Sequence, residues 1–331
     1  MRKTLLTIAA TVCALSMAVN GADAKTWKLG HIRPAGTPED KASVSFANRV
    51  GELTKGKVEI KVFPASALGD WTVVQERISI GAVEMALQPQ DTQIDKRLSI
   101  MFFPYLFTNL EQVKKNMEQD APFRVEMEKL FKKQNIHALG FWPSFFGGLA
   151  LKTLPKNWHE AGANKGIKIR VPADPAFAMN AQKMGYMVTP IPFSDAFTAM
   201  QTGIVDGIIG SGAVGYYSNF RDVVKYYLPI NDHLEIYTLM MNLDLWNGLD
   251  DTAKSQVAQA AKEMEAERYQ TFARDEAEYL KKLKDHGITI VDVTQEVING
   301  FAEVASKECW PELAEKIDKP YIEHLLSIVK K

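Results

Sequence analysis

Short apolar segments alternate with longer segments of helical periodicity along the first half of the chain. Val58, Ile60 and Val62, for example, alternate with charged residues, as in a strand with one buried face. The same periodicities predict strands at 26–31, 58–63, 83–87 and 136–141 and helices at 39–54, 72–80 and 113–134. Strands that alternate with helices are typical of a mainly parallel sheet with helices on both faces.

The strand–helix pattern starts again after residue 148. Segment 141–148 is rich in aromatic residues and glycine, which favours a crossing between two lobes. Beyond it we expect strands at 167–171, 187–190 and 205–209 and helices at 175–184 and 194–202. This second set is large enough to form a sheet of its own. Two further predicted strands, at 223–228 and 236–242, would return the chain toward the first lobe.

The longest helical pattern begins at Asp250 or Asp251, either of which can cap a helix N-terminus, and ends before His286 and Gly287. No glycine or proline interrupts it. About 34 residues at 1.5 Å each give roughly 50 Å, which exceeds the width of one small lobe. We therefore predict two α/β lobes with a cleft between them and a long helix that spans both.

The patterns also predict how the chain is divided. Lobe I takes residues 25–145 and about 232–270, and lobe II takes residues 146–231 with part of the C-terminal helices. The long helix covers residues 250–286, and a strand and helices follow at 287–331.

The first 24 residues are typical of a secretory signal peptide. Arg2-Lys3 precedes an apolar run over residues 5–19, and Ala22-Asp23-Ala24 matches a small-x-small cleavage pattern. The apolar run of about 15 residues is shorter than the roughly 20 that a transmembrane helix needs. This favours cleavage near Ala24 over a membrane anchor, and we expect a soluble protein in the periplasm.

Composition and motifs argue against several classes of function. A formal net charge of −1 provides no basic surface for nucleic acid. Cys309 is the one cysteine beyond the signal peptide, so no intrachain disulfide can form. The six histidines show no metal-ligand spacing, and no motif brings together an acid, a base and a nucleophile. We therefore predict no metal site, no cofactor and no enzymatic activity.

One motif suggests a different function. Gly210-Ser-Gly-Ala-Val-Gly215 follows an apolar strand and matches the G-x-G-x-x-G pattern of dinucleotide sites. Its place late in the chain is unlike the first strand–helix turn in which that pattern works. We interpret the glycines as positions where the backbone approaches a ligand or a neighbouring strand closely. A periplasmic NAD(P)-dependent oxidoreductase that uses this loop stays open as an alternative.

Arg170 is the strongest candidate for a binding residue. It lies in a predicted strand in which Ile167, Ile169 and Val171 alternate with Lys168 and Arg170. Its planar guanidinium can bind a carboxylate through two parallel hydrogen bonds. An arginine at such a position can also form a structural ion pair or extend to the surface. The residues alone leave these three roles open.

A series of motifs follows in order over most of the mature chain. They are Gly30-His31, Val62-Phe-Pro-Ala-Ser-Ala-Leu-Gly69, Gly81-Ala-Val-Glu-Met85, Phe103-Pro-Tyr-Leu-Phe107, Lys165-Gly-Ile-Lys-Ile-Arg-Val-Pro172, Thr189-Pro-Ile-Pro-Phe-Ser-Asp195 and Ala199-Met-Gln-Thr-Gly-Ile-Val-Asp-Gly207. Together they resemble the substrate-binding subunits of TRAP transporters, of the C4-dicarboxylate-binding type. The resemblance implies a fold of the periplasmic-binding-protein type, whose two lobes close around an organic acid. It also implies delivery of that acid to the membrane subunits of a transporter driven by an ion gradient.

The resemblance assigns roles to particular residues. It implies that Arg170 forms the main salt bridge to the ligand carboxylate and that Phe193 packs against the bound ligand. His31, in the first matching motif, is a further candidate for ligand binding.

Two positions depart from the family pattern. Family members continue Val-Asp-Gly with Gln-Glu-Asn-Pro, whose Asn binds the carboxylate, whereas this chain has Gly210 there. Backbone N–H groups or Ser211 would have to replace that amide. Sialic-acid-binding members have a second arginine upstream of the first, where this chain has Ala150. Arg170 is then expected to be the only strong charged anchor, which argues against a copied sialate or C4-dicarboxylate specificity.

Other candidate lining residues are inferred from their positions. Trp142, Phe145 and Phe146 lie at the predicted crossing, although core packing explains them equally well. Trp71 lies at a helix start, and Gln90 follows a strand, where open α/β sheets place ligands. If the aromatic residues face the cleft, a monocarboxylate with an apolar or aromatic body fits better than a compact dicarboxylate.

These observations lead to one functional prediction. We expect a monomeric periplasmic receptor of a TRAP-type secondary transporter that captures a small organic acid by closing its two lobes. An ABC-type or sensor-coupled receptor with the same lobes stays open as an alternative.

Overall fold

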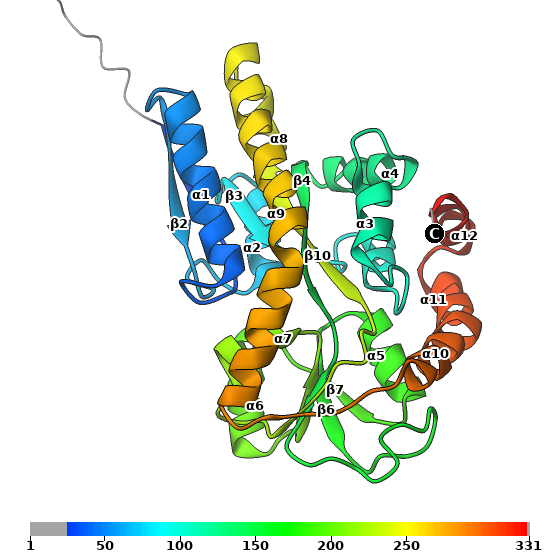
Figure 1. Ribbon diagram of the computed structural model, residues 1–331. Coiled ribbons are helices and arrows are strands. Elements are labelled where there is room, and N and C mark those ends of the chain that lie inside the picture. The colour runs from blue at the N-terminus through cyan, green and yellow to red at the C-terminus, as the bar shows by residue number, and fades with distance from the viewer. Residues whose placement is uncertain (1–24, 330–331) are drawn as a thin grey trace, which may run out of the picture.

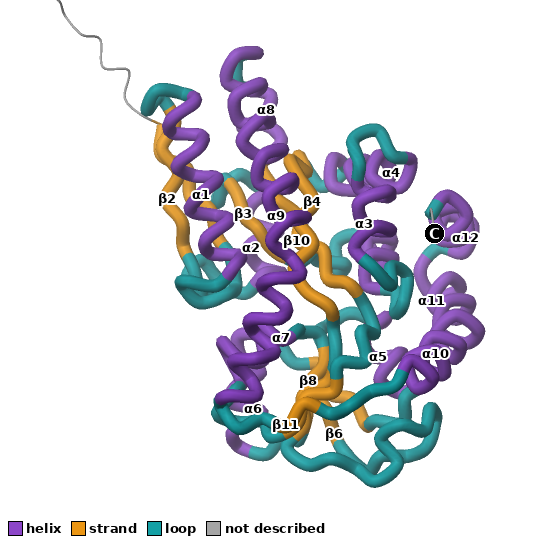
Figure 2. The backbone as a smooth tube through the Cα atoms, in the orientation of Figure 1, coloured by secondary structure: helices purple, strands orange, loops and turns teal. Residues whose placement is uncertain are grey.

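Two β-sheets with helices packed against them form two lobes, and a long helix runs past both (Figures 1 and 2). The computed structural model describes residues 25–329. The predicted signal peptide at 1–24 therefore lies outside the described residues. The predicted fold class, two α/β lobes, is confirmed.

The sheet of lobe I has the strand order β2-β1-β3-β10-β4. Its strands are β1 (Lys25–Gly30), β2 (Val58–Phe63), β3 (Met85–Gln88), β4 (Ile136–Phe146) and β10 (Leu234–Asn242). β1 runs parallel to β2 and β3, whereas β10 runs antiparallel to β3 and β4. β10 is buried along its whole length, as expected for a strand between two others with helices on its faces.

The sheet of lobe II has the order β11-β9-β5-β8-β6-β7. Its strands are β5 (Leu149–Leu151), β6 (Lys168–Val171), β7 (Met187–Pro190), β8 (Gly207–Ile209), β9 (Tyr226–Leu228) and β11 (Thr289–Ile290). β6 lies between β7 and β8 and is parallel to both. The expectation that segment 223–228 returns to lobe I was wrong. β9 pairs with β5 and β11 and completes the hydrogen bonds of β5 within lobe II.

The helices cover both sheets and extend the chain beyond them. Those of lobe I are α1 (Pro38–Leu53), α2 (Trp71–Ser79), the 3-10 helix η1 (Lys96–Phe102), α3 (Leu110–Met117), α4 (Pro122–Lys132) and α8 (Leu243–Asn247). Those of lobe II are α5 (Pro175–Lys183), α6 (Phe193–Thr202), α7 (Ala213–Gly215) and the π-helical turn η2 (Tyr216–Phe220). The C-terminal segment forms α10 (Gln295–Val304), η3 (Ala305–Cys309), α11 (Trp310–Ile317) and α12 (Lys319–Ile328).

One predicted helix is two in the structure. The pattern at 113–134 suggested a continuous helix, but α3 ends at Met117 and α4 begins at Pro122. Asp120 between them has a φ of 65°, outside the helical region, and Pro122 has no N–H to continue the helical hydrogen bonds. The break is therefore local, and the apolar periodicity on either side concealed it.

The long helix α9 (Asp251–Asp285) is confirmed nearly residue for residue. Asp250 caps it by accepting a hydrogen bond from the Ala253 amide at 2.8 Å, and His286 ends it. α9 contacts α1 and β4 of lobe I and α7, η2 and β11 of lobe II. In Figure 1 it runs along one side of the whole molecule.

The chain crosses between the lobes within segment 141–148, as predicted, but over a shorter stretch. β4 continues to Phe146, so only Gly147 and Gly148 separate it from β5. The crossing from β9 to β10 lies against this one, because the Gly147 amide donates to the His233 carbonyl at 2.8 Å. A Cβ at Gly147 would lie 2.2 Å from the His233 ring, so only glycine fits.

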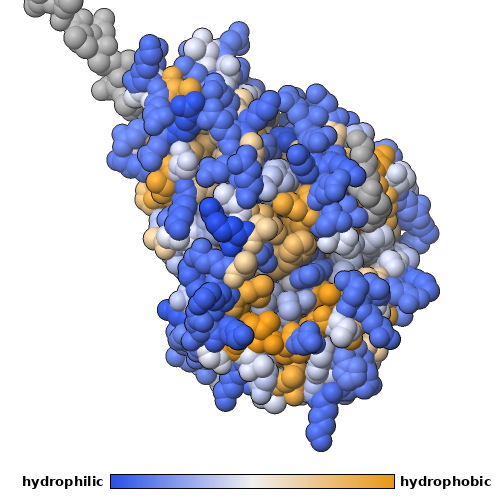
Figure 3. Space-filling model, in the orientation of Figure 1, coloured by the Kyte–Doolittle hydropathy of each residue, from blue (hydrophilic) through white to orange (hydrophobic). Residues whose placement is uncertain are grey.

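The surface is largely hydrophilic on the face that Figure 3 shows. The large apolar side chains that are exposed come from different elements and loops of both lobes: Val44, Val73, Ile80, Ile94, Met187 and Ile204. Within residues 25–329, no helix has the length and apolar character needed to cross a membrane.

Candidate functional site

A small cavity, partly open to solvent, lies between the two lobes. Lobe I contributes Ile32, Arg33, Trp71, Pro89, Phe102, Phe145, Glu235 and Tyr237, and lobe II contributes Arg170, Pro172, Phe177, Phe193 and Gly210. Several of these residues directly follow the carboxyl ends of parallel strands, where open α/β sheets bind ligands. Aromatic rings make up much of the lining, with a few charged groups between them, as in many small-molecule sites.

Hydrogen bonds hold the lobes together beside this cavity. The Asp70 carboxylate of lobe I accepts from the Ser194 amide of lobe II at 3.3 Å. Asp174 of lobe II accepts from the hydroxyls of Thr92 and Ser99 of lobe I at 2.7 and 2.9 Å. Burial raises the pKa of Asp174 to about 6, although these hydrogen bonds oppose the rise. The lobes are thus closed around the cavity.

Arg170 is a buried cation with no acidic partner among the described residues. Its side chain is 1 % exposed on β6, which lies inside its sheet. Its Nε donates to the Ile191 carbonyl at 2.8 Å and its Nη1 to the Ile209 carbonyl at 3.4 Å. Burial lowers the pKa of Arg170 to about 10, although Asp70 partly offsets this. The guanidinium is therefore charged at neutral pH and fixed in place at the cavity wall.

Phe193, the first residue of α6, forms an aromatic wall between two cations. The Arg170 Cζ lies 5.9 Å from the centre of its ring, and the Arg33 Cζ lies 5.1 Å from it. Phe220 contacts the ring edge-on at 5.8 Å. These contacts hold the ring in one orientation at the cavity.

The glycine-rich loop packs closely against its neighbours. Gly210 has a φ of 87°, and a Cβ there would lie 2.6 Å from Pro172. A Cβ at Gly212 would lie 2.5 Å from the Phe146 carbonyl, and one at Gly215 would lie 2.4 Å from the Arg33 guanidinium. The loop therefore brings backbone close to side chains of the cavity and of β4, the use that we expected for these glycines. Between the first two glycines, Ser211 is buried, and its hydroxyl has no hydrogen-bond partner among the described residues.

The structure brings Arg170, Phe193, Gly210 and Trp71 together at the cavity. Gln90 follows Pro89, which lines the cavity. Its own buried amide has no hydrogen-bond partner in the described part of the chain. His31 is also buried, and its Nε2 lies 3.1 Å from Asp40 rather than at the cavity lining.

The aromatic side chains at the crossing between the lobes face different ways, because β4 is still a strand at that point. Phe145 lines the cavity, whereas Phe146 packs edge-on against Phe272 at 5.4 Å, since successive side chains of a strand face opposite ways. Trp142 lies away from the cavity, with the Arg268 Cζ 4.3 Å from its ring.

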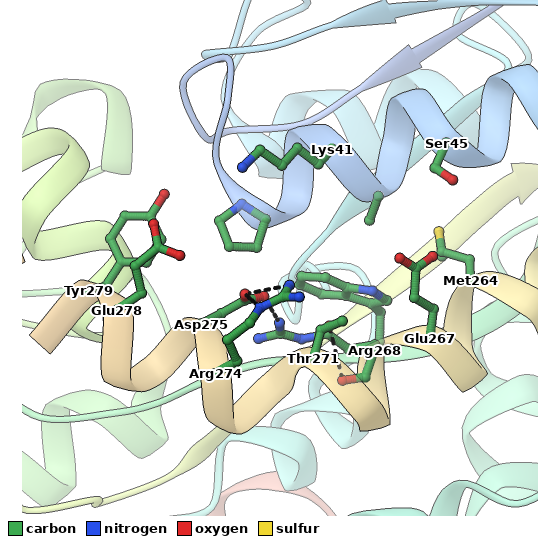
Figure 4. A pocket seen from close by; sticks show the side chains of 13 residues that line it. Lys41, Ser45, Met264, Glu267, Arg268, Thr271, Arg274, Asp275, Glu278 and Tyr279 are labelled. Atoms are coloured by element: carbon green, nitrogen blue, oxygen red, sulfur yellow. Dashed lines mark hydrogen bonds and ion pairs between the residues drawn. The ribbon is translucent and has the colours of Figure 1, made fainter.

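Trp142 instead lines a second hollow between α1 and α9 (Figure 4). Three of the charged groups there, Arg268, Arg274 and Asp275, are paired with one another. Asp275 accepts from Arg268 at 2.6 Å and from Arg274 at 3.0 Å, and Arg268 also donates to the carbonyls of Pro143 and Ser144. These contacts fix α9 to β4.

Sequence reasoning missed Arg33, which corrects the expectation of a single charged anchor. Arg33 is fully buried and lines the cavity, with its Nε 3.8 Å from the Glu39 carboxylate. Burial would lower its pKa, but Tyr237, Glu39 and Glu235 outweigh burial and raise the pKa. Arg33 follows the carboxyl end of β1, so the rule that selected Gln90 could have found it.

The described residues contain no group of three or more side chains arranged to hold a metal ion. Sequence comparison gives the context for the cavity. Residues 29–316 match the family described as bacterial extracellular solute-binding protein, family 7.

Individual relatives are similar over nearly their whole lengths. The sialic acid-binding periplasmic protein SiaP of Vibrio cholerae is 24 % identical over 98 % of this chain and 100 % of its own. The C4-dicarboxylate-binding periplasmic protein DctP of Rhodobacter capsulatus is 25 % identical over 94 % and 93 %. The sugar acid binding protein DctPAm of Advenella mimigardefordensis, solved with galactonate, has the same fold with a TM-score of 0.84, at 22 % identity over 92 % and 98 % of the two chains. The chain therefore belongs to family 7 of the bacterial extracellular solute-binding proteins, the solute receptors of TRAP transporters.

Proposed function

We propose that this protein captures a small organic monocarboxylate in the periplasm and delivers it to the membrane subunits of a TRAP transporter. Arg170 binds the carboxylate, and the aromatic lining receives an apolar or aromatic part of the ligand. The observation that carries the proposal is a buried guanidinium at a cavity wall, without an acidic partner among the described residues. A buried charge is expensive unless it is paired, so a ligand carboxylate is the natural partner.

The rest of the cavity supports this assignment. Trp71, Phe102, Phe145, Phe177 and Phe193 surround the space that Arg170 faces. Rings of this kind contribute apolar contact area to a ligand. Galactonate, which the Advenella protein binds, likewise has one carboxylate.

Three further parts of the proposal concern the whole protein. Residues 1–24 direct export and are removed near Ala24. The two lobes open and close at the Gly147–Gly148 and 229–233 crossings, with α9 as a continuous support. The receptor acts as a monomer, because its exposed apolar side chains are spread over different elements.

The proposal can be tested by thermal shift and calorimetry on the mature protein. A panel should contain aliphatic and aromatic monocarboxylates, dicarboxylates of matched length and the corresponding amides. We expect stabilisation by one or more monocarboxylates and none by the neutral amides. Equal stabilisation by an acid and its amide would contradict the role of Arg170.

A further inference from the structure

Asp70 of lobe I caps two helices that belong to different lobes. Its Oδ1 accepts hydrogen bonds from the amide and the hydroxyl of Thr72, both at 3.3 Å, and so caps the N-terminus of α2. Its Oδ2 accepts from the amide of Ser194, the second residue of α6 in lobe II, at 3.3 Å. The two oxygens of one carboxylate therefore satisfy helix ends on both sides of the gap between the lobes.

α6 has no capping side chain of its own. The residue before it is Pro192, which has no side-chain acceptor, whereas Thr37, Asn109 and Asp250 cap α1, α3 and α9 from the position directly before each helix. The first amides of a helix have no partner within the helix and need one from outside. For α6, Asp70 is that partner, and because it belongs to the other lobe, the contact exists only while the lobes are closed.

The contact lies at the rim of the cavity rather than in its wall. Trp71 and Phe193, the chain neighbours of Asp70 and Ser194, line the cavity, whereas the Asp70–Ser194 bond itself is exposed to solvent. Asp70 also attracts Arg170, and the N-terminus of α6 carries a partial positive charge. One acid of lobe I thus faces two positive features of lobe II at this rim.

We propose that Asp70 is a closure latch, which caps α6 across the rim and so keeps a fraction of the receptor closed before any acid binds. Water solvates both groups when the lobes are open, so the latch contributes as much as one helix cap, about a fivefold change in the ratio of closed to open molecules. Such a bias lowers the free energy that a bound acid must supply to close the lobes. The inference rests on the opening and closing of the lobes in the proposed function, but not on the identity of the acid.

Single-molecule FRET on the mature protein without ligand measures this ratio. Dyes at Ile80→Cys and Ile204→Cys report the distance between the lobes, because these exposed positions follow the far ends of α2 and α6. Cys309 is buried and stays unlabelled.

The first variants remove the latch. Asp70→Ala should lower the ratio of closed to open molecules about fivefold, and Asp70→Asn, which keeps an acceptor oxygen, should lower it less. Asn109→Ala is the matched control, because it removes a helix cap of lobe I that does not line the cavity. It should leave the ratio unchanged.

A second set of variants gives α6 a cap of its own. Pro192 has a φ of −51° and a ψ of 150°, close to the −61° and 153° of Asp70, so an asparagine there can cap the helix without adding charge. Pro192→Asn should lower the ratio of closed to open molecules, because α6 is then capped in the open form too. Adding Asp70→Ala should change the ratio little further. Pro192→Ala removes the proline ring without supplying an acceptor, and it should close like the wild type.

The outcomes separate the latch from lobe movement as such. Equal ratios in the wild type, Asp70→Ala and Pro192→Asn, including a wild type that never closes without ligand, overturn the latch. An Asp70→Ala effect that is as large beside Pro192→Asn as without it, or as large in Asn109→Ala, overturns it too. Should Asp70→Ala not fold, the comparison of Pro192→Asn with Pro192→Ala still decides. If the wild type shows one distance with and without every acid of the panel, the lobe movement of the proposed function fails, and the latch fails with it.

Discussion

Replacing Arg170 by methionine is expected to abolish tight acid binding while the empty protein stays folded. Methionine keeps much of the length and apolar bulk of the arginine stem but carries no charge and no donor. The substitution therefore removes the guanidinium from a cavity wall without opening a large void. It separates the role of Arg170 in binding from any role in the fold.

Two effects on stability oppose each other in this variant. Burial lowers the pKa of Arg170 to about 10, and a shift of this size corresponds to about 3 kcal/mol against the charged form. Methionine removes that penalty but leaves the carbonyls of Ile191 and Ile209 without their donors, a loss of about 1–3 kcal/mol for each if no water replaces the arginine. The bond to Ile209 is long at 3.4 Å and contributes less. We expect the unfolding free energy of the empty protein to change by no more than about 2 kcal/mol.

The effect on binding should be much larger. Truncating one partner of a buried, hydrogen-bonded charge pair costs about 2–5 kcal/mol of binding free energy. This corresponds to a loss of affinity of about 30- to 4000-fold. The affinity of Arg170→Lys should lie between that of the wild type and that of Arg170→Met, because an ammonium keeps the charge but cannot form two parallel hydrogen bonds.

Urea unfolding and calorimetry with the best monocarboxylate of the panel measure both quantities. Arg274→Met is the control for a general effect of losing an arginine, because Arg274 lies in the other hollow and its side chain is 69 % exposed. Unchanged affinity in Arg170→Met, or equal losses in both variants, would show that the carboxylate binds elsewhere. A large loss of stability in the empty protein would show that Arg170 is mainly structural.

Three further substitutions test the surroundings of the cavity. Because the pKa of Asp174 is raised to about 6, its folded state binds the proton more tightly than the unfolded state, and its stabilising contribution is lost as the pH rises through 6. Asp174→Asn should therefore raise the melting temperature at pH 7.5 more than at pH 4.5, and the reverse order would contradict the assignment. Burial opposes the charge of His233, but two adjacent carboxylates raise its pKa to about 10. The charged ring therefore stabilises the fold fully below about pH 6.5, and this effect is lost progressively as the pH rises from there through 10. His233→Gln should cost about 3–5 kcal/mol in urea unfolding at pH 7, because it leaves buried carboxylates unpaired, and a cost below 1 kcal/mol would argue against the charged form. Gly210 has a φ of 87°, and a Cβ there would lie 2.6 Å from Pro172, whereas Gly203 has a φ of 79° and no atom within 4 Å of such a Cβ. The melting temperature should therefore fall more in Gly210→Ala than in Gly203→Ala. Equal falls would exclude the close approach to Pro172.

The sequence predicted elements well where one local signal was strong. β2 alternates apolar and charged residues, and α9 has an aspartate cap and no interruption, so both were predicted almost to the residue. The break between α3 and α4 depends on one residue with positive φ and one proline within a continuous apolar pattern. The pairing of β9 depends on which strand edge is free, which local periodicity does not encode.

The candidate site was less predictable because its residues are brought together by long-range contacts. Arg170 was accessible to sequence reasoning because a family motif surrounds it. Phe145 and Phe146 could not be distinguished, since the choice depends on whether the strand continues through them and in which phase. Arg33 belongs to a segment with little periodicity, and its importance is visible only once Glu235 and Tyr237 of β10 lie beside it.

The burial of Arg170 also suggests why closure and binding are coupled. Arg170 belongs to lobe II, but Trp71 and Arg33 of lobe I line the same cavity, and the nearest acidic influence on it comes from Asp70 of lobe I. Closing the lobes without a ligand therefore leaves this cation without an acidic partner in a cavity that both lobes line, where burial lowers its pKa to about 10. A bound carboxylate supplies the missing partner in the closed state. The anchor that selects an acid is therefore also expected to favour closure of the receptor around that acid.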